Sequence, residues 1–242
     1  MRALLIQHDA QSPTGPVGER LVHHGYTLSE LLVVPPERQR DPSVEGVFPD
    51  PGAADLIVAM GAPWSVDDVA LIGPWITPEL AFLAGAHAAG VPVLGICFGG
   101  QALATALGGG VERAPRPELG WTRVETDEPS LVGPGPWFQF HFDRWILPPG
   151  VREIARNEAC SQAFVSGRSM GVQFHPEITL AELDLWLAHG GEAPLRGAGR
   201  DPEAVRAEVR RGEPASVRRT HALIDAYLSR VASAEATPPT VR

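Results

Sequence analysis

The sequence predicts an α/β protein with three layers, in which helices cover both faces of an open, mostly parallel sheet. Short apolar runs alternate with longer helical patterns through the first hundred residues, and strands separated by helices pair in parallel. Glycine and proline punctuate the ends of these segments. After Gly110 the runs become shorter and alternate apolar with polar residues, which predicts antiparallel additions in the second half of the sheet.

The first half of the chain is expected to hold four strands and three helices. Pro74 near the start of one helix, and Gly25 and Gly90 just past the ends of two expected helices, follow the preference for proline in the first turn and glycine after the last. This order is that of a flavodoxin-like sheet. The expected strands are residues 3–7, 27–34, 55–60 and 91–96, and the expected helices are residues 17–24, 74–89 and 99–107.

The second half is expected to add shorter strands, with residues 166–169 as the turn of a hairpin between the last two. Residues 80–111 contain no charged side chain, which raises the question of a membrane span. Their glycines and Pro92 divide the stretch into short pieces, so it is expected to be a buried layer of the protein. The expected strands are residues 121–126, 136–142, 153–156, 160–165 and 170–174.

A glycine-containing connection that begins near residue 190 divides the chain into two parts. Residues 1–190 are expected to form the main domain, and residues 191–242 a helical extension that packs on the same domain or on a partner chain. Asp201 before Pro202 is a good helix cap. The extension is expected to contain helices at residues 201–211 and 214–232, an apolar stripe of Val217, His221, Ile224 and Leu228, and a frayed end at residues 233–242.

The composition limits the classes of function. The chain of 242 residues carries a formal net charge of −9, which argues against nucleic acid or an anionic membrane as the main partner. Two cysteines, Cys97 and Cys160, give no disulfide framework and fit a reducing compartment. The first residues reach polar side chains too early for a secretion signal, so a cytoplasmic protein is expected.

Cys97 is the first candidate for chemistry, because it stands between glycines at an expected turn from strand to helix. Residues 95–101 are Gly-Ile-Cys-Phe-Gly-Gly-Gln. A side chain on so sharp a turn points away from the sheet, and the glycines keep neighbouring Cβ atoms clear of it. The N-terminus of the next helix should favour the thiolate. The competing interpretation is a buried, inert cysteine, which is expected instead for Cys160.

His175 is the candidate base. Residues 171–177 are Gly-Val-Gln-Phe-His-Pro-Glu, and Pro176 stops this short strand at the histidine by removing the next ladder donor. Glu177 can reach back to the imidazole, fix its tautomer and stabilise the imidazolium formed when it takes the cysteine proton. A lone histidine at a strand end is usually structural, and the chain has eight histidines. His175 differs from the other histidines because Pro176 and Glu177 follow it directly.

Together the two motifs resemble the signature of the class I (triad) glutamine amidotransferases, in particular stand-alone chains similar to the amidotransferase domain of GMP synthase. The resemblance covers roughly residues 1–190, and two motifs in the right order are far more informative than either alone. It implies that Cys97 attacks the carboxamide of glutamine, that ammonia leaves, and that water resolves a γ-glutamyl thioester. His175 would be the general base and then the acid, oriented by Glu177.

The resemblance also implies an oxyanion hole built from backbone N–H groups. One belongs to Phe98, directly after the cysteine, and the other comes from Gly61 and Ala62 in the loop after the expected strand 55–60. Ala62 replaces a glycine of the family, and an alanine at a position that requires a positive φ is strained by about 1 kcal/mol. The plainer interpretation of this loop is an ordinary exit from a strand.

Three further residues are implied as substrate contacts. Residues 137–143 resemble the family's His-Gly-Asp segment, so Asp143 would pair with the α-ammonium of glutamine, next to His141. Phe142 stands where the family has glycine, and a half-buried strand of alternating phenylalanines explains the same run. Gln101, one turn into the helix after the cysteine, is the third contact. Neither a metal nor a cofactor is expected.

Three classes of function remain open. The first is a glutamine amidotransferase that delivers ammonia to a synthetase or ligase on another chain, since this chain shows no phosphate-binding glycine loop. The second is a stand-alone hydrolase of another γ-glutamyl amide or peptide with the same triad, which Ala62 and Phe142 keep open. The third is a non-enzymatic relative that binds a metabolite or protein, which the intact Cys97, His175 and Glu177 disfavour.

Overall fold

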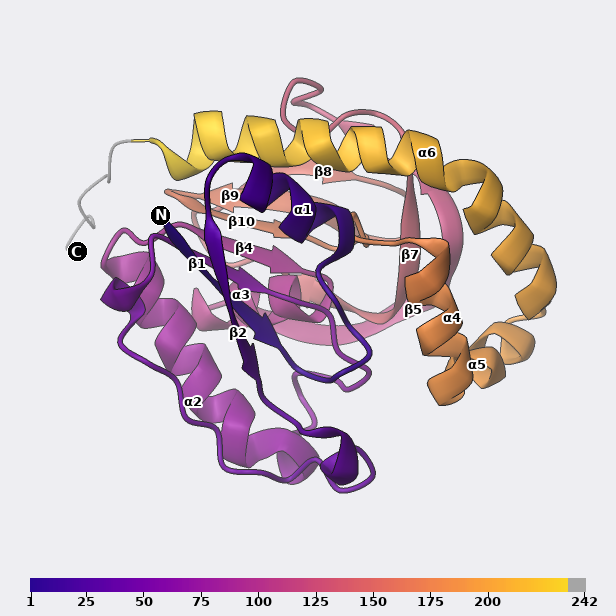
Figure 1. Cartoon of the computed structure of the whole chain (residues 1–242), viewed down its shortest axis with the longest axis horizontal. Coiled ribbons are helices and arrows are strands. Elements are labelled where there is room, and N and C mark those ends of the chain that lie inside the picture. Colours follow the sequence, from indigo (N-terminus) through magenta and orange to yellow (C-terminus); the bar gives the residue numbers. More distant parts are fainter. Residues whose placement is uncertain (235–242) are drawn as a thin grey trace.

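The computed structural model describes residues 1–234 as an open sheet with helices on both faces (Figure 1). The strand order β2-β1-β3-β4-β10-β9-β8-β6 is parallel from β2 to β10 and antiparallel beyond it, and β5 and β7 form a separate antiparallel ribbon. The expected α/β class is confirmed. The strands are β1 (Arg2–Gln7), β2 (Thr27–Leu32), β3 (Leu56–Ala59), β4 (Val93–Ile96), β5 (Gly110–Arg123), β6 (Glu125–Thr126), β7 (Pro136–Ile146), β8 (Arg152–Arg156), β9 (Ser161–Ser166) and β10 (Ser169–Val172).

The helices divide between the two faces of the sheet. They are α1 (Gly15–His23), α2 (Val69–Ala88), α3 (Phe98–Ala106), α4 (Leu180–Trp186), α5 (Glu192–Gly197) and α6 (Pro202–Tyr227), with short 3-10 or π turns at Pro36–Arg38, Pro51–Ala53, Leu187–Gly191 and Leu228–Ala232. Side chains of α1 and α6 share one core with the sheet, and those of α2 and α3 share the other. These are the three layers expected from the sequence.

The order of the parallel strands reverses at β1. From β1 the chain passes to β2 on one side of the sheet and then to β3 on the other. β1 pairs with β2 on one side and with β3 on the other, and β4 pairs with β3 and β10. In open α/β sheets such a switch point leaves a crevice where ligands bind. His8, Gly61 and Cys97 follow β1, β3 and β4 at this edge.

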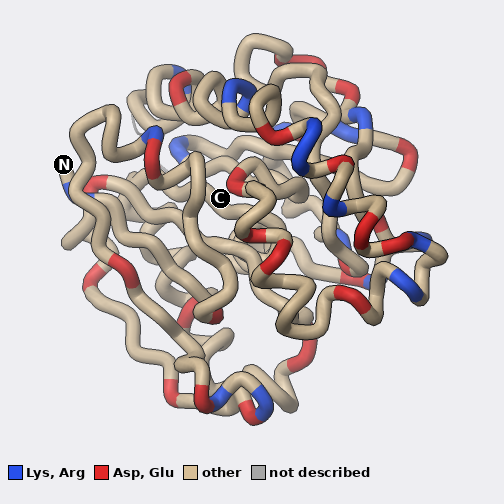
Figure 2. The backbone as a smooth tube through the Cα atoms, turned by 45° about the vertical axis from the view of Figure 1, so that its right-hand side comes forward, with Lys and Arg blue, Asp and Glu red and all other residues tan. Residues whose placement is uncertain are grey.

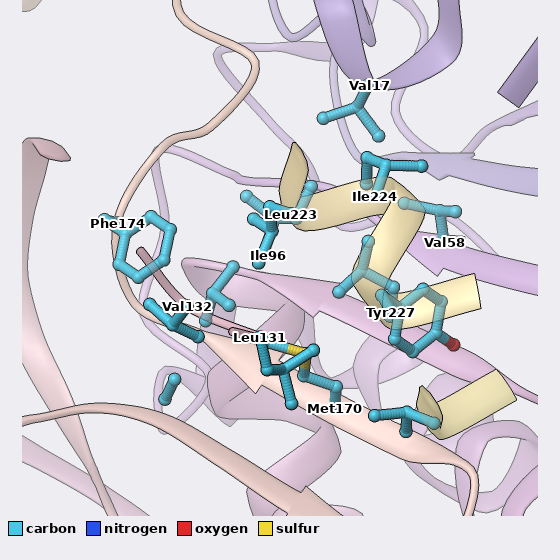
Figure 3. Packing of buried hydrophobic residues seen from close by; sticks show 14 of the residues in the cluster. Val17, Val58, Ile96, Leu131, Val132, Met170, Phe174, Leu223, Ile224 and Tyr227 are labelled. Carbon is cyan, nitrogen blue, oxygen red and sulfur yellow. The ribbon is translucent and has the colours of Figure 1, made fainter. Parts of the chain in front are cut away.

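The helical extension contributes to the main core. On the α6 face, Leu223 and Tyr227 are buried in one cluster with Val58 and Ile96 of the sheet (Figure 3). Complete burial of a large apolar side chain contributes about 1.5–3 kcal/mol to folding. The first half of α6 packs elsewhere, in a third cluster beneath the β5–β7 ribbon that includes α4 and α5. From residue 235 onward the expected frayed end lies outside the described residues.

One helix, α2, is long and apolar enough to cross a membrane by length and composition. In the structure Ile72, Trp75 and Leu83 of this helix are buried against the sheet. The uncharged stretch from residue 80 to 111 spans the end of α2, β4 and α3, the buried layer expected for it.

The expected start of α2 at Pro74 is wrong, since the helix begins at Val69 and contains both Pro74 and Pro78. Pro78 cannot donate to the carbonyl of Pro74 four residues before it. That carbonyl instead accepts the backbone N–H of Gly46 at 3.3 Å. A contact with a distant loop therefore satisfies a group that the proline leaves unpaired.

The ribbon is longer than the pattern predicts, because β5 begins at Gly110 instead of residue 121. Pro115 and Pro117 interrupt this strand, and its register with β7 shifts between Arg113 and Glu118. Proline cannot donate to a ladder and is confined to bulges and edges of sheets. The first part of β5 was not predicted because Pro115 and Pro117 interrupt its sequence pattern.

The two helices expected at residues 201–211 and 214–232 form one continuous helix, α6, that includes Pro214. Tertiary contacts carry the helix through this point: a Cβ on Gly212 would lie only 2.9 Å from the ring of Trp121, and the Glu213 carboxylate accepts the N–H of Leu180 at 2.9 Å. The expected stripe is also displaced. The buried face consists of Thr220, Leu223, Ile224 and Tyr227, whereas Val217, His221 and Leu228 are half-buried.

Candidate active site

Cys97 occupies the turn between β4 and α3 in a backbone conformation that side chains rarely adopt. Its φ is 50° and its ψ is −108°, and it is the one non-glycine residue with a positive φ among residues 1–234. Such a conformation costs on the order of 1–3 kcal/mol and is concentrated at functional sites. The side chain is 5% exposed and lines a cavity of about 380 Å³.

Gly95 and Gly99 explain how so tight a turn is possible. A Cβ on Gly99 would lie 2.1 Å from the carbonyl oxygen of Ala59, and a Cβ on Gly95 would lie 2.5 Å from that of Gly99. The N–H of Gly99 donates to the carbonyl of Met60 at 3.0 Å. These glycines therefore let α3 lie directly against the sheet, in addition to leaving the cysteine unobstructed as the sequence suggests.

His175 lines the same cavity and forms a buried pair with Glu177. Nδ1 of His175 lies 2.7 Å from Oε1 of Glu177, and the backbone N–H of His175 donates to the carbonyl of Phe138 at 2.8 Å. The Trp186 ring packs edge-on against the imidazole, with centroids 4.8 Å apart. Within residues 1–234, Nε2 of His175 is buried without a hydrogen-bond partner. This leaves one ring nitrogen available for proton transfer.

The charges around His175 favour its protonated form. Burial by itself lowers the pKa of His175, but the neighbouring Cys97 sulfur and Glu177 carboxylate outweigh burial and hold the pKa well above its ordinary value. An imidazolium beside a cysteine is the arrangement that activates thiol nucleophiles. Burial and the charge of Glu177 also raise the pKa of Glu182 on α4 well above its ordinary value.

The loop after β3 lies against the imidazole. A Cβ on Gly61 would be 3.3 Å from Cε1 of His175, and Gly61, Ala62 and Phe98 line the same cavity as Cys97. Ala62 does not have a positive φ, so the alanine causes none of the strain that a left-handed position would impose. Phe98 is the first residue of α3, where backbone N–H groups lack partners within the helix.

Gln101, His141 and Asp143 meet at another wall of the cavity. Nε2 of Gln101 and Nδ1 of His141 donate to the backbone carbonyl of Asp143 at 3.0 and 2.9 Å. The Asp143 carboxylate lies 3.2 Å from the guanidinium of Arg113, which in turn lies 4.9 Å from the ring centre of Phe142. Gln101 and His141 thus hold the backbone that presents Asp143, and all three residues line the cavity.

One side of the cavity is formed by residues that were not predicted from the sequence. Asp9, Gln11 and Ser12 from the loop after β1 line it, together with Trp186 and His189. The indole N–H of Trp186 donates to the carbonyl of Gln11 at 3.0 Å, and burial raises the pKa of Asp9. The place of Asp9 after a parallel strand was a usable signal, because such strand ends share one edge. No sequence pattern marks Trp186.

Cys160 lies in a different buried cluster with Glu118 and His141. Their sulfur, oxygen and nitrogen atoms lie within 4.8 Å of one another, a spacing that metal ligands can have. Hydrogen bonds account for the arrangement, because Glu118 accepts from the side-chain amides of Asn157 at 2.6 Å and Gln162 at 2.8 Å. Burial and the charge of Glu118 raise the pKa of the Cys160 thiol. A protonated, hydrogen-bonded thiol of this kind is a poor nucleophile.

Solved structures of amidotransferases share this fold over nearly their whole length. The glutamine amidotransferase of Thermotoga maritima superposes with a TM-score of 0.79 at 23% identity, over 97% of this chain and 99% of that one. The glutamine amidotransferase of Methylobacillus flagellatus gives a TM-score of 0.79 at 26% identity, over 100% and 99%.

Sequence comparison leads to the same class of protein. The GMP synthase [glutamine-hydrolyzing] of Alkalilimnicola ehrlichii is 40% identical over 154 residues, which are 56% of this chain and 27% of that protein. The corresponding enzyme of Aeropyrum pernix is 40% identical over 112 residues, 41% of this chain and 22% of the enzyme. The chain thus matches about a quarter of the length of these relatives. A model of the family Glutamine amidotransferase class-I matches residues 17–188, and the chain belongs to this family.

Proposed function

We propose that the chain hydrolyses the side-chain carboxamide of L-glutamine and delivers the ammonia to an acceptor enzyme. The observation that carries the proposal is the placement of Cys97, on a strained turn that opens into a cavity shared with the buried His175–Glu177 pair. Membership of the class I glutamine amidotransferases supports the same chemistry.

In the proposed reaction the Cys97 thiolate attacks the carboxamide carbon, and the carbonyl oxygen becomes an oxyanion that the N–H groups of Ala62 and Phe98 stabilise, with Gly61 shaping the loop. The His175 imidazolium gives its proton to the nitrogen, the C–N bond breaks, and ammonia leaves a γ-glutamyl thioester. His175 then takes a proton from water as the water oxygen attacks the thioester. The γ-carboxylic acid that forms gives its proton to solvent and leaves as glutamate, and the thiolate–imidazolium pair returns.

The opposite wall supplies charges for the amino-acid end of the substrate. The carboxylate of Asp143 would bind the α-ammonium, and the adjacent Arg113 the α-carboxylate, since both side chains line the cavity. Gln101 and His141 would act on the substrate through the carbonyl of Asp143 that they hold.

A synthetase or ligase on another chain is the proposed acceptor, because the GMP synthases that match this chain are about four times as long as the matching segment. One observation favours a second candidate, hydrolysis of a larger γ-glutamyl amide. The cavity continues from Asp143 to Trp186, His189 and Gly190, beyond the residues that glutamine needs in this proposal.

Ammonia release from L-glutamine and from a panel of γ-glutamyl amides separates the two candidates. We expect slow turnover of glutamine by the purified chain and faster turnover when the acceptor enzyme is added. Efficient turnover of another γ-glutamyl amide, unchanged by cell extract, would replace the amidotransferase with the hydrolase. Cys97→Ala should abolish release in both cases, and Cys160→Ala should match the wild type. Full activity of Cys97→Ala would refute both candidates.

A further inference from the structure

His8 and Glu79 form a second buried histidine–carboxylate pair, behind the loop that follows β3. Both residues have no exposed surface. Nε2 of His8 lies 2.9 and 3.1 Å from the two carboxylate oxygens of Glu79 on α2, and Nδ1 lies 3.2 Å from the carbonyl oxygen of Gly61. Carbonyl and carboxylate oxygens only accept hydrogen bonds. Nδ1 therefore carries a hydrogen, and with Glu79 ionised Nε2 carries one as well, so that the ring is an imidazolium.

The surroundings of this pair are apolar. The His8 ring packs edge-on against Phe98, with centroids 4.7 Å apart. It also packs against Trp75 in a tilted arrangement, with centroids 5.6 Å apart. Burial lowers the pKa of His8, but the charge and hydrogen bond of Glu79 outweigh it and leave the pKa above its ordinary value. Replacing a buried ion pair with apolar side chains is often neutral or stabilising. Stability alone is therefore a weak reason for a charged pair at this place.

The direction of one peptide group connects the pair to the cavity. In a trans peptide the C=O and the following N–H point in opposite directions, and residues 1–234 contain no cis peptide. The carbonyl of Gly61 points inward to His8, so the N–H of Ala62 points the other way. Gly61, Ala62 and Cys97 line the cavity on that side.

We propose that His8, held by Glu79, positions the Gly61–Ala62 peptide so that the N–H of Ala62 is directed at the oxyanion. The inference rests on the proposed function and deepens it. A donor on the carbonyl also polarises the peptide and strengthens its N–H as a donor. His8 does not line the cavity and acts through Ala62, which makes it a positioning residue.

The test compares binding of the ground state with binding of a tetrahedral adduct. An aldehyde analogue of glutamine forms a thiohemiacetal with Cys97 and places its oxygen in the oxyanion hole. In His8→Gln we expect aldehyde affinity and kcat to fall about 10- to 100-fold, less than the 10²–10³-fold typical for deleting an oxyanion donor. The affinity for L-glutamine, measured in the Cys97→Ala background, should stay within about twofold, since no ground-state contact is removed.

Three comparisons keep the test specific. His8→Asn, whose amide can reach the position of Nδ1, should recover part of the loss. His87→Asn removes a half-buried histidine that contacts Ser169 instead of the site, and should match the wild type. If His8→Gln does not fold, Glu79→Gln replaces it, with the same expected loss of aldehyde affinity.

Equal losses of aldehyde and glutamine affinity, or a kcat of His8→Gln within twofold of the wild type, would overturn the inference while leaving the proposed function intact. A wild-type chain that neither hydrolyses glutamine nor binds the aldehyde would overturn both. Nitrogen NMR of the His8 ring is an independent check, because the proposal requires Nδ1 to carry a hydrogen at neutral pH. An unprotonated Nδ1 would contradict the proposal.

Discussion

Cys97 and His175 come from separate halves of the chain and meet because of strand register. β4 and β10 pair in parallel with Ile96 opposite Val172, and the N–H of Cys97 donates to the carbonyl of Val172 at 2.8 Å. The chain then continues from Val172 for three residues to His175, which brings the imidazole to the same edge of the sheet. A local motif supplies each residue type, but only the pairing of these strands brings the two together.

Substitutions in the histidine–glutamate pair test the roles assigned to them. His175→Ala should lower kcat for amide hydrolysis by roughly three to six orders of magnitude, because the base and the proton donor to ammonia are both lost. Glu177→Gln should cost less, because it removes orientation and charge but leaves the imidazole. Pre-steady-state ammonia release measures the acylation step. Near-normal acylation in His175→Ala would remove the histidine from the mechanism.

A charge-specific prediction concerns Asp143. Asp143→Asn should weaken binding of L-glutamine by about 1.5–3 kcal/mol, the range for hydrogen bonds to charged groups, and should hardly affect an analogue with a blocked amino group. Calorimetric titration in the Cys97→Ala background measures both affinities. Equal losses for the two compounds would show that Asp143 only supports the wall that it shares with Gln101 and His141.

The parts of the site that could be predicted from the sequence lie in short, unusual runs of residues. The glycines around Cys97 and the proline after His175 are local signals of a turn and of a strand end, and both segments line the cavity. Trp186 and His8 carried no such signal. Their places depend on how distant elements pack, on the contact of Trp186 with Gln11 and of His8 with Glu79.

At the scale of elements, the contact between α3 and the sheet depends on glycine. Gly99→Ala should lower the free energy of unfolding by about 1–3 kcal/mol, the usual cost of overpacking, because the new Cβ would lie 2.1 Å from a backbone oxygen. Gly197→Ala is the matched control, since a Cβ there would meet no atom within 4 Å. Urea unfolding measures both variants. A Gly99→Ala protein as stable as the control would contradict the described packing of α3.

An ion-pair network joins α6 to α1. The Asp225 carboxylate accepts from Arg20 at 2.7 and 2.6 Å and lies 2.6 Å from Nε2 of His24. The Arg20 guanidinium and His24 hold the pKa of Asp225 at about 2, below its ordinary value of 3.8. Because the carboxylate is 40% exposed and screened by solvent, we expect the network to contribute about 0.5–1 kcal/mol at neutral pH.

The sign of this pH dependence follows from the lowered pKa. A carboxyl group whose folded-state pKa is depressed stabilises the fold above its unfolded-state pKa and loses that effect as the pH falls through the folded value. The stability difference between wild type and Asp225→Asn should therefore be complete above about pH 4 and shrink between pH 4 and 2. Urea unfolding at pH 7 and pH 3 measures it. A difference that stays constant or grows on acidification would contradict the network.

The elements that sequence patterns placed well have a clear apolar pattern and clear ends, such as the buried strand β1 and the amphipathic helix α1. The errors fall at prolines. Pro74 and Pro214 suggested helix boundaries, although both lie inside helices. Pro115 and Pro117 concealed the first part of β5. At Pro74 a loop contact satisfies the carbonyl that Pro78 leaves unpaired, and at Pro115 and Pro117 the register with β7 shifts. The local sequence pattern contains no information about such adjustments.

At the scale of the whole molecule, α6 reaches from the α1 face of the sheet to the edge where the cavity opens. The hydroxyl of Thr220 on this helix donates to the carbonyl of Pro176, between His175 and Glu177, at 2.5 Å. Figure 2 shows charged residues mainly on the outer helices and loops, with few along the central strands. Helix α6, which lies wholly after the segment matched by the family, thus supports the backbone of the candidate site directly.

The central claim is that Cys97 forms a covalent γ-glutamyl intermediate, and trapping that intermediate tests it most directly. The chain is mixed with L-glutamine, quenched in acid during turnover, digested and examined by mass spectrometry. The account predicts one glutamyl group on the peptide that contains Cys97, none on the peptide that contains Cys160, and no adduct in Cys97→Ala. A glutamyl adduct on Cys160, or turnover by Cys97→Ala at the wild-type rate, would contradict it.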